Sequence, residues 1–155
     1  MAILRKANVE TVVDVRRYPG SRRNPQFNQG PLSETLAAAG IQYRHVEALG
    51  GRRSGELGEE RFACIRPPSF ASYAARIGTR EWQEALAAAM NAPAPCFLCA
   101  ETDWRRCHRK LISELLVARG HEVLHLLPGR VEPHPLSDDA EVRGGRLYLC
   151  GELVA

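Results

Sequence analysis

Short apolar and β-branched runs alternate with segments of helical periodicity along most of the chain. The runs predict strands at residues 11–15, 41–46, 96–99 and 122–127, and a further strand at 146–150. Residues 12–15 and 97–99 are expected to be buried parallel strands. Because side chains alternate along a strand, Ile41, Tyr43 and His45 are expected on one face of the second run. Residues 128–145 are rich in turn formers and predict a tail of turns.

Helices are predicted between these runs, at residues 31–39, 69–77, 81–90 and 104–119. Gly40 suits the end of the first, and Asp103 suits the N-cap of the last. An apolar stripe that includes Leu111, Ile112 and Leu115 is expected to be buried against the sheet. Strands that alternate with helices favour an α/β fold, here a single three-layer domain over residues 1–155 with a mainly parallel, Rossmann-like sheet.

Length and composition fit this fold. The chain has 155 residues, 45% hydrophobic and 25% charged, which is close to the average for globular domains. No apolar run approaches the roughly 20 residues of a membrane helix, and no secretory signal is visible. We therefore expect a cytoplasmic protein with no membrane partner, in which the five cysteines are reduced thiols.

The positions of the basic residues are more informative about binding partners than the net charge is. Net charge is +3, but Lys6 and Lys110 are the only lysines among the 21 basic residues. The arginines cluster in pairs, at Arg16-Arg17, Arg22-Arg23, Arg52-Arg53 and Arg105-Arg106. Because the planar guanidinium recognises phosphates and carboxylates, these pairs indicate either a solvated surface or a site for an anion.

Open parallel sheets bind ligands at the carboxyl ends of their strands, and the polar segments 14–17, 45–51 and 99–103 lie there. Asp14 and Arg16 would share one side of a strand, either as a structural ion pair or as a pair that turns Arg16 toward an anion. Glu101 follows a strand, and His108 falls on the buried stripe of the next helix. His108 is either a hydrogen-bonded core residue or a general acid or base.

The cysteines allow a different chemistry. Cys96 and Cys99 form a CxxC, but residues three apart in a strand face opposite ways and there is no second CxxC, so no metal site is predicted. If a metal were bound, Cys99, Cys107 and His108 would be the better ligands. Cys107, at a helix start beside two arginines, is either a reactive thiol or a packed one.

Several motifs resemble, in this order, the bacterial domain-of-unknown-function family 488. They are Asp14-Val15-Arg16, Pro19, Ser21, the Asn-Pro-Gln-Phe-Asn of 24–28, Gly40-Ile41-Gln42-Tyr43, Leu49-Gly50-Gly51, 70–73, Cys99-Ala100-Glu101, Cys107-His108-Arg109 and 120–125. The resemblance implies an α/β domain and no established activity. Members begin with a strand and a helix, of which residues 1–9 resemble only the helix end, so we expect the family's first strand to be missing.

We predict a cleft at the strand ends that binds an anion, either a nucleotide or a nucleic-acid phosphate. Glu101 and His108 are the candidate acid–base groups, and Arg16, Glu101, His108 and Arg109 are expected to share that cleft. The candidate ligand-binding residues are Asp14, Arg16, Arg17, Ser21, Arg52, Arg53 and Arg109. Two alternatives remain: a non-catalytic nucleic-acid-binding module with the same arginines, and a thiol- or metal-dependent protein with Cys99, Cys107 and His108.

Overall fold

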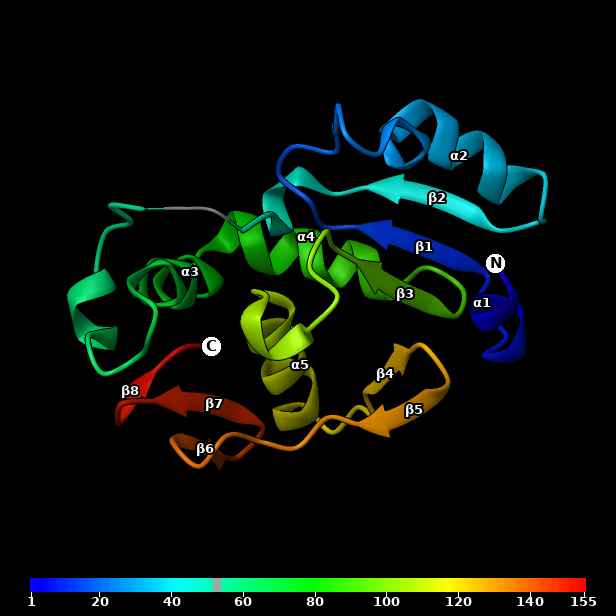
Figure 1. The fold of residues 1–155 in the computed structure, drawn as a ribbon. Coiled ribbons are helices and arrows are strands. Elements are labelled where there is room, and N and C mark those ends of the chain that lie inside the picture. The colour runs from blue at the N-terminus through cyan, green and yellow to red at the C-terminus, as the bar shows by residue number, and fades with distance from the viewer. Residues whose placement is uncertain (52–53) are drawn as a thin grey trace. The chain divides into compact units, whose positions relative to one another are not determined.

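The computed structural model describes residues 1–51 and 54–155 (Figure 1). The chain divides into two compact units. The first unit comprises Met1–Gly50 and Glu84–Ala100, and the second comprises Gly51–Gln83 and Glu101–Ala155. The chain passes from one unit to the other three times, so each unit is built from two separate stretches.

The first unit contains a three-stranded parallel sheet with the strand order β2-β1-β3. Its strands are β1 (Thr11–Asp14), β2 (Gln42–His45) and β3 (Pro95–Leu98). Its other elements are α1 (Ala2–Lys6), α2 (Gln29–Ala37) and the short 3-10 turns η1 (Pro25–Phe27) and η2 (Glu47–Leu49). Helix α4 (Arg80–Met90) contributes residues to both units.

The central strand β1 is buried at all four of its positions, as expected for the middle of a parallel sheet. Val12 packs in an apolar cluster with Ile41 and with Leu32 and Leu36, which α2 presents one turn apart. In β2 the exposure alternates, with Tyr43 partly covered, which agrees with the predicted face. The edge strand β3 is only half-buried, whereas the sequence predicts that it is buried.

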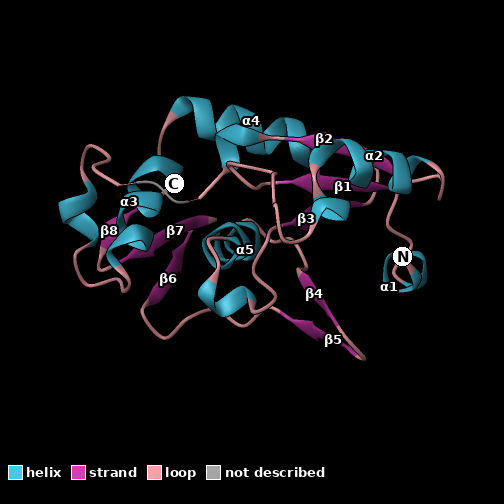
Figure 2. Ribbon diagram, turned by 45° about the horizontal axis from the view of Figure 1, so that its top comes forward, coloured by secondary structure: helices cyan, strands magenta, loops and turns pink. Residues whose placement is uncertain are grey.

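The second unit combines helices with two small antiparallel sheets (Figure 2). Its helical elements are η3 (Glu59–Phe62), α3 (Pro68–Ile77), η4 (Trp104–Arg106) and α5 (Arg109–Ala118). Its strands are β4 (Leu124–Leu127), β5 (Arg130–Pro133), β6 (Ala140–Arg143), β7 (Arg146–Leu149) and β8 (Glu152–Leu153). None of the described helices is long and apolar enough to cross a bilayer.

The α/β class is confirmed, but the expectation of one mainly parallel sheet needs correction. The predicted strand at 122–127 pairs antiparallel with β5, and the one at 146–150 lies between β6 and β8. Gly129, at φ 78°, allows the chain to reverse at once after β4, and adjacent strands joined by a tight turn pair antiparallel. The predicted tail of turns contains β5 and β6, whose mostly exposed residues give no alternating pattern.

The predicted helix at 104–119 is divided. Asp103 caps its start as predicted, accepting a hydrogen bond from the Arg105 backbone N–H at 3.0 Å. Cys107 is extended (φ −118°, ψ 145°) and separates η4 from α5. Leu111, Ile112 and Leu115 are buried as predicted, in a helix that contacts β6 and β7 of the same unit.

Two of the five cysteines form a disulfide, so the expectation that all five are reduced is wrong. Cys64 and Cys150 are 86 residues apart in sequence, and their Cα atoms lie 6.0 Å apart. Cys96, Cys99 and Cys107 carry thiols. Since the bond joins two distant stretches of the second unit, it depends on tertiary proximity, which cysteine spacing does not reveal.

Replacement of Leu115 by alanine should lower the free energy of unfolding by about 2–5 kcal/mol, because the side chain is fully buried in α5. Urea denaturation followed by circular dichroism measures this loss. Leu124→Ala is the matched control, since Leu124 is 49% exposed and should lose much less. Equal losses in the two variants would contradict the packing of α5.

Candidate functional site

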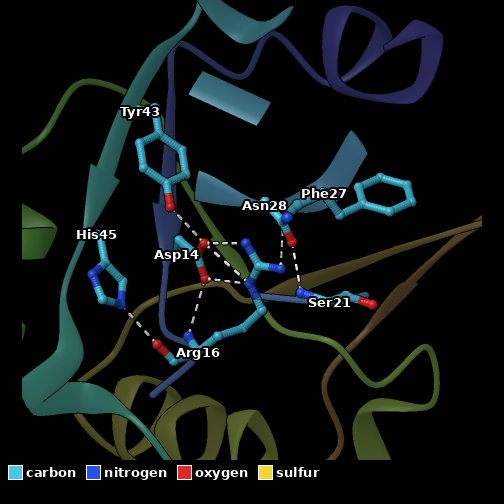
Figure 3. A network of polar contacts seen from close by, with 7 residues as sticks. All are labelled: Asp14, Arg16, Ser21, Phe27, Asn28, Tyr43 and His45. Atoms are coloured by element: carbon cyan, nitrogen blue, oxygen red, sulfur yellow. Dashed lines mark hydrogen bonds and ion pairs between the residues drawn. The ribbon is translucent and has the colours of Figure 1, made fainter. Parts of the chain in front are cut away.

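Asp14, the last residue of β1, is the centre of a buried polar network in the first unit (Figure 3). Its Oδ1 accepts a hydrogen bond from Arg16 Nε at 2.8 Å, and its Oδ2 accepts one from an Arg16 terminal nitrogen at 2.5 Å. Tyr43, on the neighbouring strand β2, donates its hydroxyl to Oδ2 at 2.6 Å. A buried carboxylate is tolerated here because the Arg16 guanidinium and the Tyr43 hydroxyl supply the hydrogen bonds that water would otherwise donate to it.

Arg16 is itself held on several sides. Its third guanidinium nitrogen donates to the Phe27 carbonyl at 2.8 Å, and its own carbonyl lies 2.8 Å from Nε2 of His45 (Figure 3). All three guanidinium nitrogens therefore bond to protein oxygens, and the residue is 8% exposed. The structural ion pair considered for Asp14 and Arg16 is present, and it ties η1 to the end of β1.

The charges in this network are fixed at neutral pH. Burial alone would raise the pKa of Asp14, but hydrogen bonds from Arg16 and Tyr43 outweigh it and hold that pKa below its ordinary value. Burial and the adjacent carboxylate raise the pKa of Tyr43 well above the usual range. Asp14 is thus ionised and Tyr43 protonated, which suits positioning rather than proton transfer.

Beyond this network the chain forms a closed loop, residues 16–28, which we call the arginine loop. The Gln29 N–H donates to the Pro19 carbonyl at 3.1 Å. The Ser21 N–H donates to Oδ1 of Asn28 at 2.6 Å (Figure 3). The hydroxyl of Ser21 accepts from the Asn24 N–H at 3.0 Å. Ser21 therefore shapes the loop through both its backbone and its side chain.

A second cluster of polar groups lies in the second unit and consists of Glu101, Cys107, His108 and Arg109, the 101–109 cluster. Sγ of Cys107 lies 3.4 Å from a carboxylate oxygen of Glu101 and 3.7 Å from Nδ1 of His108. Arg109 donates through Nε to the same sulfur at 3.3 Å and through a terminal nitrogen to the Glu101 carbonyl. One guanidinium thus holds both ends of this short segment together.

His108 is the N-cap residue of α5 and is 8% exposed, so its predicted burial is confirmed. Its ring packs edge-on against Tyr73 of α3, with 5.0 Å between ring centroids. Gly51 covers another side of the imidazole: a Cβ at that position would lie 2.6 Å from Nδ1. Any side chain larger than that of glycine would displace the histidine, and this explains the glycine there.

A third cluster joins Trp104 to the β4–β5 hairpin. His125 stacks on the indole with 4.2 Å between centroids, and its Nε2 lies 2.8 Å from Nδ1 of His134. The indole N–H donates to Glu132 at 2.8 Å. One imidazole must donate and the other accept, so the accepting ring is neutral. Burial lowers the pKa of both rings to about 4, which keeps both neutral at pH 7.

The predicted site residues fall into two groups. Glu101, His108 and Arg109 lie together in the second unit. The candidates Asp14, Arg16, Arg17 and Ser21 belong to the first unit, while Arg52 and Arg53 lie outside the described residues. One cleft that contains Arg16 together with the other three remains a prediction.

Several important residues were not identified from sequence. Tyr43 was recognised only as part of a strand face, although its neighbour Asp14 required a donor. The pairing of His125 with His134 depends on the β4–β5 hairpin, which the hydrophobic pattern does not predict. Two histidines on either side of a Pro-Gly turn are the signal that could have indicated it.

Comparison with known families agrees with the resemblance seen in the motifs. The model of the family described as "Domain of unknown function DUF488" matches residues 1–116. The chain belongs to this family. The DUF488 match includes the arginine loop and the whole 101–109 cluster and ends within α5. No curated protein and no solved structure matches the chain.

The paired histidines of this DUF488 protein should make it less stable in mild acid. Burial lowers the pKa of both His125 and His134 to about 4. The unfolded chain binds protons from about pH 6.5 downward, whereas the folded chain does not until about pH 4. The free energy of unfolding should therefore be greatest above pH 6.5 and fall steadily between pH 6.5 and pH 4.

Urea denaturation over this pH range measures the effect. His134→Asn removes one of the two groups and should make the fall clearly shallower than in the wild type. His121→Asn is the control, because His121 is exposed and should leave the fall unchanged. The explanation fails if the wild type and His134→Asn lose stability in parallel.

Proposed function

We propose that the arginine loop binds single-stranded nucleic acid through its phosphates and its bases. The observation that carries this proposal is a run of residues, 15–33, with four arginines and no acidic residue, from which two aromatic side chains project. A single strand offers both partners that such a surface needs, namely a regular row of phosphates and accessible base faces.

The phosphate contacts fall to three arginines. Arg22 and Arg23 are exposed on the loop, and Arg17 is half-buried with its guanidinium over the ring of Tyr18, 5.2 Å from the centroid. Arg16 is left out, because Asp14 neutralises it and the protein occupies its donors. Apart from Arg17, the loop presents the two exposed positive charges of Arg22 and Arg23, and residues 15–33 include no acidic residue.

The aromatic rings of Tyr18 and Phe27 make the base contacts in this proposal. Tyr18 is 64% exposed and Phe27 is 50% exposed, so both rings are accessible to a base. They come from opposite arms of the closed loop, next to the contacts of Pro19 and Arg16 that close it. Stacking on such rings contributes about 1–3 kcal/mol per base and tolerates any sequence.

The buried network supports this function by positioning. Asp14, Arg16 and Ser21 bind no ligand in this proposal, but they hold the loop in one conformation before a strand arrives. A preorganised loop loses less conformational freedom on binding, which favours affinity. Arg109 is used within the 101–109 cluster and belongs to the other unit, so it has no part here.

The phosphate contacts are tested by the salt dependence of binding to a fluorescent mixed-sequence single strand, measured by anisotropy. In the variant R22A/R23A the slope of log K against log salt should decrease by about 1.4, since each contact to a single strand contributes about 0.7. R5A/K6A is the matched control, because it removes two exposed charges of the same unit from α1 and should keep the wild-type slope.

The base contacts are tested separately with Y18L/F27L, which keeps the bulk but removes both rings. Affinity should fall by about 1–3 kcal/mol for each base that stacks, while the salt slope stays the same. If R22A/R23A and R5A/K6A change the salt slope equally, the oligonucleotide is held only by general electrostatic attraction to the protein and not by the arginine loop. Equal affinity for a free nucleotide and for the oligonucleotide would indicate a small-anion site instead.

A further inference from the structure

We propose that Glu101, Cys107 and His108 bind one zinc ion. The three side chains lie within eight residues of one another in sequence, and all belong to the second unit. Their ligand atoms, a carboxylate oxygen, Sγ and a ring nitrogen, lie within 4.8 Å of one another. This site is independent of the arginine loop and of the function proposed for it.

The spacing of these atoms is that of ligands around a tetrahedral ion. Zinc bonds of about 2.3 Å to sulfur and about 2.0–2.1 Å to nitrogen or oxygen place neighbouring tetrahedral ligands roughly 3.5 Å apart. Sγ of Cys107 lies 3.4 Å from the Glu101 oxygen and 3.7 Å from Nδ1 of His108. Both separations suit a shared ion with only small adjustments.

The surroundings keep the ligands in this arrangement. Arg109 holds the Glu101 carbonyl and donates through Nε to the sulfur of Cys107. Such an N–H···S contact beside a metal ligand stabilises a thiolate and fixes its direction. Gly51 packs so closely on Nδ1 of His108 that the imidazole has little freedom to turn away. Arg109 and Gly51 are thus positioning residues.

The types of donor select the ion. Thiolate and imidazole favour zinc over magnesium or calcium, which prefer oxygen ligands. On binding, the S–H bond of Cys107 breaks, the sulfur bonds to zinc, and the proton goes to solvent. Three ligands leave a fourth tetrahedral position for water or another donor. Glu101 is half-buried, whereas Cys107 and His108 are buried.

A nucleophilic cysteine is the competing interpretation of this cluster. A nucleophile must reach its substrate, and Cys107 is 1% exposed. A metal ligand has no such requirement, because structural and catalytic zinc ligands are commonly enclosed by their neighbours. Cys99, a candidate ligand in the sequence analysis, belongs to the first unit, and the three-donor set does not include it.

The test uses the full chain, freed of metal by a chelator and then titrated with Co²⁺ alone. Wild type should bind one Co²⁺ per chain with a sulfur-to-cobalt charge-transfer band, and Zn²⁺ should displace it. C107S should lose the band, whereas C96S, the matched control for another thiol, should keep it. H108Q and E101Q should bind at least about tenfold more weakly, and R109Q about 10–100-fold more weakly with the band retained.

Circular dichroism and cooperative unfolding of each metal-free variant establish that it folds. If C107S does not fold, E101Q decides, since Glu101 is half-buried and glutamine has the same shape. The proposal is overturned if wild type binds no stoichiometric Co²⁺. It is also overturned if C107S keeps the band, if C96S loses it, or if folded E101Q and H108Q bind like wild type. Alkylation of Cys107 in a wild type that takes up no cobalt would favour the nucleophile.

Discussion

The ion pair between Asp14 and Arg16 is the constraint on which the first unit depends. A charged carboxylate at the end of a fully buried strand costs several kcal/mol unless donors replace its water. Here the donors come from Arg16 on the same chain segment and Tyr43 on the next strand. The pair therefore links the register of β1 and β2 to the path of the loop that follows. A substitution that removes one partner would leave the other charge buried without its counter-charge.

Local pattern was enough to predict most elements of this fold. The β-branched run of β1 and the amphipathic periodicity of α3, α4 and α5 are visible within a short window of sequence, and the structure has them within a few residues. Strand pairing is not local in this sense. The direction of β4 was missed because it depends on a partner, β5, whose exposed side chains carry no periodic signal.

The same distinction applies to the candidate sites. The pairing of Asp14 with Arg16 could be predicted, because two residues along a strand share a side. The approach of Glu101 to Cys107 could not, since it depends on the extended backbone of Cys107 between two helical segments that sequence joins into one. Residues three apart in a strand face opposite ways, which separates Cys96 from Cys99 but does not restrict ligands that a turn brings together.

The disulfide has a topological consequence. Cys64 lies in one stretch of the second unit and Cys150 in the other, so the covalent ring that they close contains residues 84–100, which belong to the first unit and include β3. One edge strand of the parallel sheet, β3, therefore lies within the covalent ring, whereas both cysteines that close the ring belong to the second unit. A single proteolytic cut anywhere between the two cysteines would open the polypeptide without separating it, and the two fragments would stay one molecule until a reductant reached the bond.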